Sequence, residues 1–215
     1  MNRVIAGLYA VTPEGAGEEG LLQRSEQALT GGARILQYRD KSENHALRSR
    51  IATALAGLCR TYQALFIVND DIDLASVSGA HGVHLGRDDA TLVHARAALG
   101  PRAVIGASCY NDLDRAEEAV RAGADYLAFG SFYASAVKPS AVRASLDLLR
   151  EARRRFDLPL VAIGGITPQN APALVEAGAD ALAVVTALFE AADTRSVAQS
   201  FARLFGQRAS AVSSA

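Results

Sequence analysis

The chain has 215 residues, half of them apolar, and a formal net charge of -1. This charge balance argues against a general nucleic-acid or membrane-surface binder, because both classes favour a cationic face. No run of about 18 apolar residues occurs and the first residues read as a strand, so we expect a cytoplasmic, soluble protein without a transmembrane helix or signal peptide. Two cysteines are too few for a disulfide scaffold.

Short β-branched runs alternate with amphipathic segments along the whole chain. Eight runs are predicted as strands: 3–11, 34–39, 65–69, 82–86, 103–108, 125–131, 158–165 and 180–186. Helical segments lie between them at 18–32, 44–62, 71–80, 88–100, 113–124 and 145–156, and a last helix starts at 196. We expect one domain over residues 1–207 and a disordered tail over 208–215.

A weak internal repeat organises these elements. Gly-Ala pairs at Gly32, Gly79, Gly123 and Gly178 each end a helix and introduce the second, fourth, sixth or eighth strand. Glycine at such a position suits the left-handed residue that stops a helix. The repeating unit is therefore two strands and two helices, and four units close into a (β/α)₈ TIM barrel. A doubly wound open sheet is the alternative, but it rarely needs eight such regular units.

In a barrel of this kind, functional residues lie at the carboxyl ends of the strands. The second predicted strand ends in "LQYRDK", where alternation puts Gln37, Arg39 and Lys41 on one face. Arg39 paired with a neighbouring carboxylate is one interpretation. The other is an anionic ligand with several acceptor groups, such as a pyrophosphate, which suits both an arginine fork and a mobile lysine charge.

Two aspartates predict a metal site beside these cations. Asp70 and Asp89 follow adjacent strands, and Mg²⁺ takes one or two carboxylates together with water and phosphate oxygens. An N-cap role is the alternative for Asp70, whereas Asp71 and Asp88 are predicted to be solvated or capping residues. No His–Cys set suggests zinc.

A second anion site is predicted at the end of the barrel. "AIGGIT" places Gly164 and Gly165 after the seventh strand, and "AVVT" ends the eighth; barrels often bind a monophosphate there. No general base stands out, and His84 is predicted to pack or hydrogen-bond inside the barrel. A reaction that depends on stabilising a leaving group needs little base catalysis. The lack of an evident base therefore agrees with a reaction between two phosphate-bearing ligands.

The motifs "LQYRDK", "VNDDIDLA", "GVHLGRDD", "IGAS", "GADYLAFGSFYASAVKP" and "VAIGGITPQNAPALVEAGADALAVV" resemble, in order, those of the thiamine-phosphate synthase family. The resemblance runs from about residue 8 to residue 190. It implies a transferase that joins 4-amino-5-hydroxymethyl-2-methylpyrimidine pyrophosphate to a thiazole monophosphate and uses one Mg²⁺ per subunit. The implied mechanism is dissociative: pyrophosphate leaves, and the thiazole nitrogen attacks the pyrimidine cation.

The resemblance also implies a role for each matching residue. The pyrimidine pyrophosphate would contact Gln37, Tyr38, Arg39, Asp40, Lys41, Asn69 and Ser108, and Mg²⁺ would bind Asp70 and Asp89. Lys138 would stabilise the departing pyrophosphate and act with Arg39, Lys41 and Ser108 as the catalytic set. The thiazole phosphate would contact Ser135, Ala136, Val137, Lys138, Gly165, Val185 and Thr186.

Four positions depart from the commonest family pattern: Arg87, Ala134, Val137 and Thr186. Val137 lacks a hydroxyl that is frequent near the thiazole phosphate, although backbone N–H groups remain there.

Two other functions stay open at this point. A thiazole tautomerase shares the barrel but tends to carry a histidine just after the fifth strand, where this chain has Cys109 and Tyr110. A non-catalytic phosphate-binding barrel would not need two aspartates and Lys138 around a metal. We expect small-molecule partners, neither nucleic acid nor membrane, and leave a homo-oligomer open.

Overall fold

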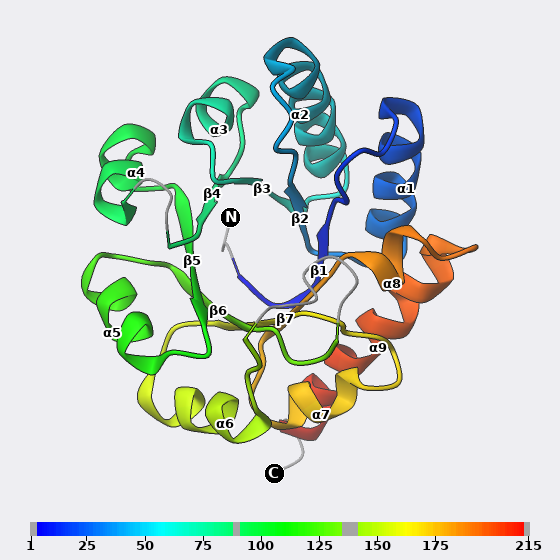
Figure 1. The fold of residues 1–215 in the computed structure, drawn as a ribbon. Helices are drawn as coiled ribbons and strands as arrows, with labels where there is room; N and C mark the ends of the chain where they lie inside the picture. Colours follow the sequence, from blue (N-terminus) through cyan, green and yellow to red (C-terminus); the bar gives the residue numbers. More distant parts are fainter. Residues whose placement is uncertain (1–3, 88–90, 135–141, 213–215) are drawn as a thin grey trace.

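The computed structural model describes residues 4–87, 91–134 and 142–212, and side chains as far as residue 206. Eight parallel strands pair in chain order and β1 pairs with β8, so the sheet closes into a barrel and the TIM-barrel prediction is confirmed (Figure 1). The strands are β1 (Gly7–Val11), β2 (Ile35–Tyr38), β3 (Leu65–Asn69), β4 (Gly82–Leu85), β5 (Val104–Tyr110), β6 (Tyr126–Gly130), β7 (Leu160–Ile163) and β8 (Ala181–Val184).

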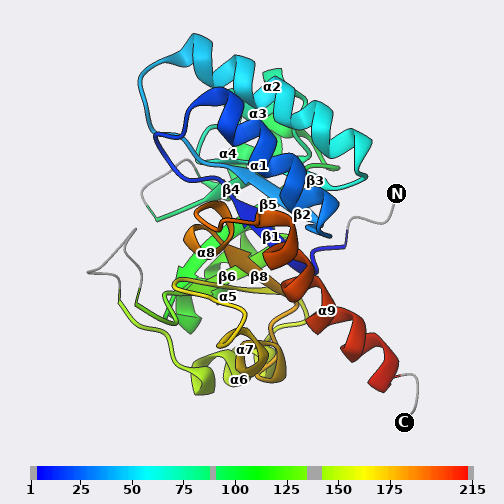
Figure 2. The ribbon, with the colours of Figure 1, turned by 90° about the vertical axis from the view of Figure 1, so that its right-hand side faces the viewer.

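Helices surround the strands on the outside of the ring (Figure 1). They are α1 (Glu18–Thr30), α2 (His45–Thr61), α3 (Ile72–Ser78), α4 (Leu92–Leu99), α5 (Leu113–Arg121), α6 (Leu146–Arg155), α7 (Ala171–Glu176), α8 (Thr186–Phe189) and α9 (Thr194–Val212). Figure 2 shows α9 crossing the outside of the barrel and extending beyond it. Because α9 runs to Val212, the helix enters the segment predicted as a tail, whose disorder stays a prediction. In the described ranges, no helix is long and apolar enough to cross a membrane.

Alternation along the strands divides the buried side chains into two layers. Tyr9, Ile35 and Ile67 belong to an inner cluster that fills the barrel, whereas Leu36 and Tyr38 belong to the outer cluster between strands and helices. Gln37 lies between two outward residues of β2, and its amide reaches the inward Tyr9. The predicted split of this strand into two faces is therefore correct for Gln37 and Tyr38.

The four Gly-Ala pairs form the repeated feature that closes the barrel at its amino-terminal rim. Gly32, Gly79, Gly123 and Gly178 all have left-handed φ values, between 70° and 112°, as predicted for helix stops. The residue after each pair donates its backbone N–H to the preceding strand, for example Asp180 to the Leu160 carbonyl at 2.8 Å. We call these four Gly-Ala-X triplets, with the strand starts that they contact, the lower rim.

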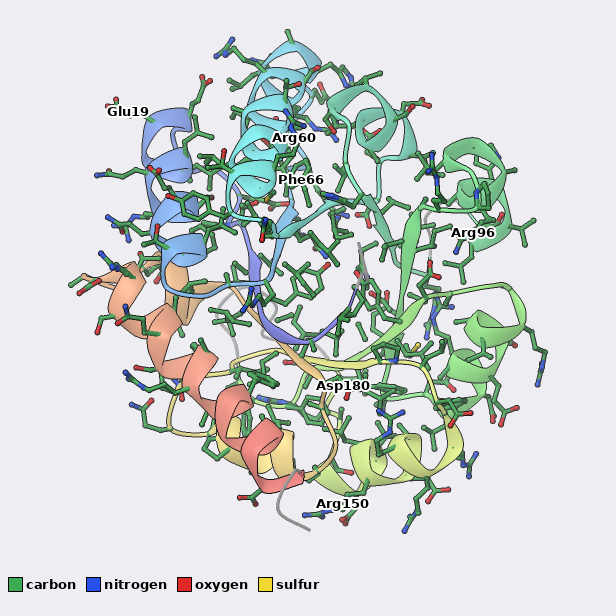
Figure 3. All side chains as sticks on the ribbon, turned by 180° about the vertical axis from the view of Figure 1, so that it is seen from behind. Glu19, Arg60, Phe66, Arg96, Arg150 and Asp180 are labelled. Carbon is green, nitrogen blue, oxygen red and sulfur yellow. The ribbon has the colours of Figure 1, made fainter. Side chains whose placement is uncertain are left out.

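Side chains in the lower rim repeat the same contact. Asp125 Oδ2 accepts the Ile105 N–H at 2.7 Å, Asp180 Oδ2 accepts the Leu160 N–H at 2.8 Å, and His81 Nδ1 accepts the Phe66 N–H at 2.9 Å. Figure 3 shows Asp180 against the ring of strands. The contact of His81 with the Phe66 N–H therefore serves the stability of this end.

Candidate active site

The candidate site lies at the opposite end, where the strands finish. A cleft of about 460 Å³ opens beside the ends of β2 and β3. Its lining residues are Asp40, Lys41, Arg48, Asn69, Asp70, Asp71, Ile72, Asp73 and His94. The cleft thus brings together four residues predicted as site residues (Asp40, Lys41, Asn69 and Asp70), and it combines carboxylates with cations.

The end of β2 supplies an amide and a guanidinium. Gln37 is 5% exposed and donates from Nε2 to the Tyr9 hydroxyl at 2.7 Å. Arg39 lies 2.7 Å from Glu14, so its pairing with a neighbouring carboxylate does occur. Because the Glu14 side chain is 45% exposed, such a pair contributes only about 0–1 kcal/mol.

The end of β3 carries a carboxylate on an unusual backbone. Asp70 has a left-handed φ of 65°, donates its N–H to the His84 carbonyl at 2.9 Å, and pairs through Oδ2 with Lys41 Nζ at 3.0 Å. The N-cap of α3 is Asp71, which accepts the Leu74 N–H at 2.8 Å. The N-cap alternative for Asp70 is therefore wrong, and capping by Asp71 is confirmed.

The left-handed backbone of Asp70 is strained. A non-glycine residue in this region is strained by about 1–3 kcal/mol and persists only where its surroundings hold it. The strain and the bond to β4 leave the Asp70 carboxylate in the cleft with Lys41 as its ion-pair partner. Such a carboxylate suits the predicted metal site, where Mg²⁺ would take the place of Lys41.

Tyr38 in the outer cluster pairs with Asp40, which lines the cleft. The Tyr38 hydroxyl donates to Asp40 Oδ2 at 2.9 Å. Burial raises the pKa of Asp40, but hydrogen bonds from the Ser42 backbone and side chain and from Tyr38 outweigh it, so the pKa lies below its ordinary value. The Tyr38 side chain belongs to the outer cluster, so its implied contact with substrate, which stays a prediction, would run through the backbone.

Ser108, at the end of β5, is held on two sides. Its Oγ lies 2.9 Å from His84 Nε2, and its carbonyl accepts from Arg115 Nε at 2.7 Å. The β5–β6 register shifts between Ser108 and Tyr110, which turns the strand at this point. The predicted hydrogen bond of His84 inside the barrel is confirmed.

Sequence reasoning did not single out Tyr9 and Tyr126. Tyr9 connects Gln37 to Tyr126, and Tyr126 lies 3.0 Å from His84 Nδ1. A signal was available: both are tyrosines at inward positions of predicted strands, where a buried hydroxyl needs a partner.

Arg87, which departs from the family pattern, packs on Tyr110, the last residue of β5. Its guanidinium carbon lies 5.1 Å from the centre of the Tyr110 ring, and the backbone N–H of Arg87 donates to the Tyr110 hydroxyl at 3.3 Å. The neighbouring Cys109 is fully buried, which raises the pKa of its thiol to about 12. Cys109 therefore offers no base where a tautomerase tends to carry histidine.

The glycine pair after β7 permits a close approach of another segment. Gly164 and Gly165 have φ values of 104° and 63°, and an added methyl group at either would overlap the chain at Ser131 or Ala134. Tyr133 donates its N–H to the Gly164 carbonyl at 3.0 Å, so this segment follows the turn. Asn170 then fixes the turn by donating to the Gly165 carbonyl at 3.0 Å.

The predicted monophosphate residues of β8 begin a short helix. Val185 is the N-cap of α8, and Thr186 is its first residue. Four more residues predicted for this ligand (Ser135, Ala136, Val137 and Lys138) lie outside the described ranges, as do Asp88 and Asp89. Among the described residues, no group of three or more His, Cys, Asp or Glu side chains could hold a metal ion, and the predicted pairing of Asp70 with Asp89 stays a prediction.

Comparison with known proteins finds relatives of one family over nearly the whole chain. The family described as thiamine monophosphate synthase matches residues 8–188. Thiamine-phosphate synthase of Thiobacillus denitrificans is 55% identical over 95% of this chain and 97% of its own length, and that of Nitrosospira multiformis is 50% identical over 95% and 87%. The structure of thiamine phosphate pyrophosphorylase from Pyrococcus furiosus superposes with a TM-score of 0.85 at 33% identity, covering 94% of this chain and 96% of that one. The chain belongs to the thiamine monophosphate synthase family.

Proposed function

We propose that this protein is a transferase of thiamine biosynthesis. It joins 4-amino-5-hydroxymethyl-2-methylpyrimidine pyrophosphate to 4-methyl-5-(2-phosphooxyethyl)thiazole, and releases thiamine monophosphate and pyrophosphate. The observation that carries the proposal is the relative named thiamine-phosphate synthase, 55% identical over 95% of this chain.

The cationic end of β2 is proposed to bind the pyrophosphate. Arg39 and Lys41 are each paired with one carboxylate, Glu14 and Asp70, at 2.7 and 3.0 Å. A pyrophosphate would replace these carboxylates as the partner of both cations, because it offers more charge and a bidentate acceptor. Gln37 and Asn69 would complete the contacts from the same rim.

Asp70 and Asp89 would hold one Mg²⁺ per subunit. The fit rests on Asp70, whose strained backbone presents a carboxylate in a cleft lined by oxygen donors. Mg²⁺ bound there would neutralise charge on the oxygens of the departing pyrophosphate. Lys41 would then turn from Asp70 toward the pyrophosphate.

Bond cleavage would come before bond formation. The C–O bond between the pyrimidine methylene group and the pyrophosphate breaks, and its electron pair leaves with the pyrophosphate, which Arg39, Lys41 and Lys138 stabilise. Ser108 orients the pyrimidine ring while that ring delocalises the positive charge. The thiazole nitrogen then donates its lone pair to the methylene carbon, so no proton has to be removed at either reacting atom.

The thiazole phosphate would occupy the far side of the same rim. We assign it to Ser135, Ala136, Val137, Lys138, Gly165, Val185 and Thr186. The left-handed turn at Gly165 and the start of α8 at Thr186 support a phosphate contact made through backbone N–H groups. We also propose a cytoplasmic location, where the free thiols Cys59 and Cys109 would stay reduced.

The test is product formation by the purified protein. Pyrimidine pyrophosphate and thiazole phosphate are supplied with Mg²⁺, and then with excess chelator, and thiamine phosphate is oxidised to fluorescent thiochrome. Metal-dependent product supports both the activity and the metal site, and product that persists in chelator removes the metal assignment. Isomerised thiazole precursor without any condensation would move the assignment to a tautomerase.

A further inference from the structure

Five side chains from five strands form one continuous path of hydrogen bonds through the barrel. Gln37 Nε2 donates to the Tyr9 hydroxyl at 2.7 Å, and the hydroxyls of Tyr9 and Tyr126 lie 2.8 Å apart. The Tyr126 hydroxyl lies 3.0 Å from His84 Nδ1, and His84 Nε2 lies 2.9 Å from Ser108 Oγ. The path therefore joins Gln37 on β2 to Ser108 on β5, two residues assigned to the pyrimidine pyrophosphate.

The two tyrosines at the centre are sealed from solvent. Tyr9 is 1% exposed and Tyr126 is 0% exposed. Burial raises the pKa of both phenols well above their ordinary value, so each hydroxyl keeps its proton throughout the neutral range. Each therefore has one proton to donate and can accept from a neighbour.

Donor counting gives the path a direction. Gln37 donates to Tyr9, so a path in which every buried proton has an acceptor has the Tyr9 hydroxyl donating to Tyr126 and the Tyr126 hydroxyl donating to His84 Nδ1. A neutral imidazole that accepts at Nδ1 carries its proton on Nε2, which faces Ser108. Ser108 Oγ accepts that proton, and its own O–H is left to donate elsewhere.

The sequence makes room for this arrangement. Gly106 lies on β5 beside the ring of Tyr126, and a methyl group at position 106 would overlap the hydroxyl end of that ring. Other members of the inner cluster, such as Ile35, Ile67 and Val161, are aliphatic, so a polar path is no general property of this interior. Simple filling of the barrel needs a ring at position 126 but no hydroxyl.

We propose that Tyr9 and Tyr126 are positioning residues that fix the direction of the Ser108 hydroxyl through the tautomer of His84. This rests on the proposed function, in which Ser108 contacts the pyrimidine. Ring nitrogens of an aminopyrimidine accept hydrogen bonds, so a serine held as a donor suits a ring nitrogen. The same path ties the pyrimidine contact to Gln37 on the opposite wall.

The test is a double-mutant cycle with Tyr126→Phe and Ser108→Ala. Tyr126→Phe keeps the ring and removes the donor to His84 Nδ1, so we expect kcat/KM for the pyrimidine pyrophosphate to fall about tenfold while KM for the thiazole phosphate is unchanged. In the Ser108→Ala background the same substitution should change kcat/KM less than about twofold. Tyr9→Phe leaves the bond from Tyr126 to His84 in place and is expected to lower kcat/KM by only about threefold.

Tyr62→Phe is the matched control, because it removes a phenol hydroxyl that bonds Glu26 on the outside of the barrel. Its kcat/KM should equal that of the unmodified protein. An equal loss from Tyr126→Phe in both Ser108 backgrounds, or no loss in either, would overturn the proposal.

A second readout is independent of turnover. Nitrogen-15 NMR of the histidines in the full-length protein should show His84 protonated at Nε2, and Tyr126→Phe should shift it toward protonation at Nδ1. Absence of synthase activity in the unmodified protein would refute the proposed function but leave this measurement valid. A His84 tautomer that does not respond to Tyr126→Phe would refute the positioning role.

Discussion

Two aspartates of the lower rim and Asp70 at the carboxyl end of the barrel have different kinds of partner. In the lower rim, Asp125 and Asp180 each accept from a backbone N–H of a neighbouring strand and from an arginine, Arg96 or Arg153, at 2.7 or 2.8 Å. At the carboxyl end, Asp70 pairs with Lys41 and Arg39 pairs with Glu14, and these contacts join side chain to side chain. The aspartates of the two lower-rim pairs are also tied to the backbone, which holds the fold, whereas the two pairs at the carboxyl end are the ones that we propose to be exchanged for a ligand.

Backbone conformation differs in part between the two ends. The left-handed residues of the four Gly-Ala-X triplets are glycines, where the conformation has little steric penalty, although Gln63, just before β3, also has a positive φ of 54°. At the carboxyl end Asp70 and Tyr110 adopt positive φ values of 65° and 55° with full side chains. At Asp70 this strain accompanies a carboxylate that lines the cleft, as expected of a side chain held for binding.

The largest expected effect comes from the carboxyl end. Arg39→Ala should lower kcat by about 10²–10³-fold, because the departing pyrophosphate loses a charge-assisted donor. Arg39→Lys keeps the charge without the fork and should give an intermediate loss. Steady-state thiochrome assays measure both, and thermal unfolding should show little change for either.

Arg50→Ala is the matched control for Arg39. Arg50 also pairs with a nearby glutamate, Glu18, at 2.6 Å, but on the exposed surface of α2. Its removal should change kcat less than about twofold, in line with the small contribution of exposed ion pairs. Equal losses from the two substitutions would contradict the functional separation of the two ends.

At the lower rim we expect a loss of stability in place of activity. Asp180→Ala removes the acceptor for Arg153 and leaves the Leu160 N–H, which belongs to a fully buried residue, without that partner. The free energy of unfolding should fall by about 1–3 kcal/mol in urea titrations, while kcat of the folded fraction is unchanged. Asp147→Ala, which breaks an exposed pair with Arg150, should alter stability by less than about 0.5 kcal/mol. A lowered kcat in Asp180→Ala would show that the two ends are coupled.

This contrast explains which features could be predicted from the sequence. The Gly-Ala pairs act through local backbone conformation, so their spacing predicts the left-handed stops and the number of barrel units. Alternation likewise predicts that Gln37 and Tyr38 face opposite ways. Local pattern therefore contains most of the fold.

The exchangeable contacts could not be predicted in the same way. The pairing of Arg39 with Glu14 and the bond between the Tyr9 and Tyr126 hydroxyls, 117 residues apart, depend on how distant strands meet. The strained backbone of Asp70 depends on its bond to the carbonyl of His84, and nothing in "VNDD" separates it from the capping Asp71. The sequence shows which residue types could bind a phosphate or a metal ion, but it does not show which residues they contact in the fold.

Tyr38 tests whether position at the carboxyl end is enough to make a side chain functional. Its hydroxyl donates to Asp40, so Tyr38→Phe should lower the free energy of unfolding by about 1 kcal/mol at pH 7. The pKa of Asp40 is lowered in the fold, so its contribution is present above the unfolded pKa and is lost as pH falls through the folded pKa. The difference in free energy of unfolding between the variant and the unmodified protein should therefore be smaller in acid than at pH 7. Urea titrations at pH 7 and in acid measure it. A difference that is constant with pH would assign the loss to packing.

The smallest expected effect concerns Lys41, which is paired with Asp70 in this structure. Lys41→Met removes a positive charge 3.0 Å from the carboxylate, so Mg²⁺ no longer competes with it. Because the Lys41 side chain is 59% exposed, the pair contributes about 0.2–1 kcal/mol, and Mg²⁺ binding without substrate should tighten by only about 1.4- to fivefold. Calorimetric titration of the purified protein measures this change, and Lys41→Arg, which keeps the charge, should not show it. Weaker Mg²⁺ binding by Lys41→Met would mean that Lys41 supports the metal site instead of occupying the metal's place, and the exchange of cations at Asp70 would have to be abandoned.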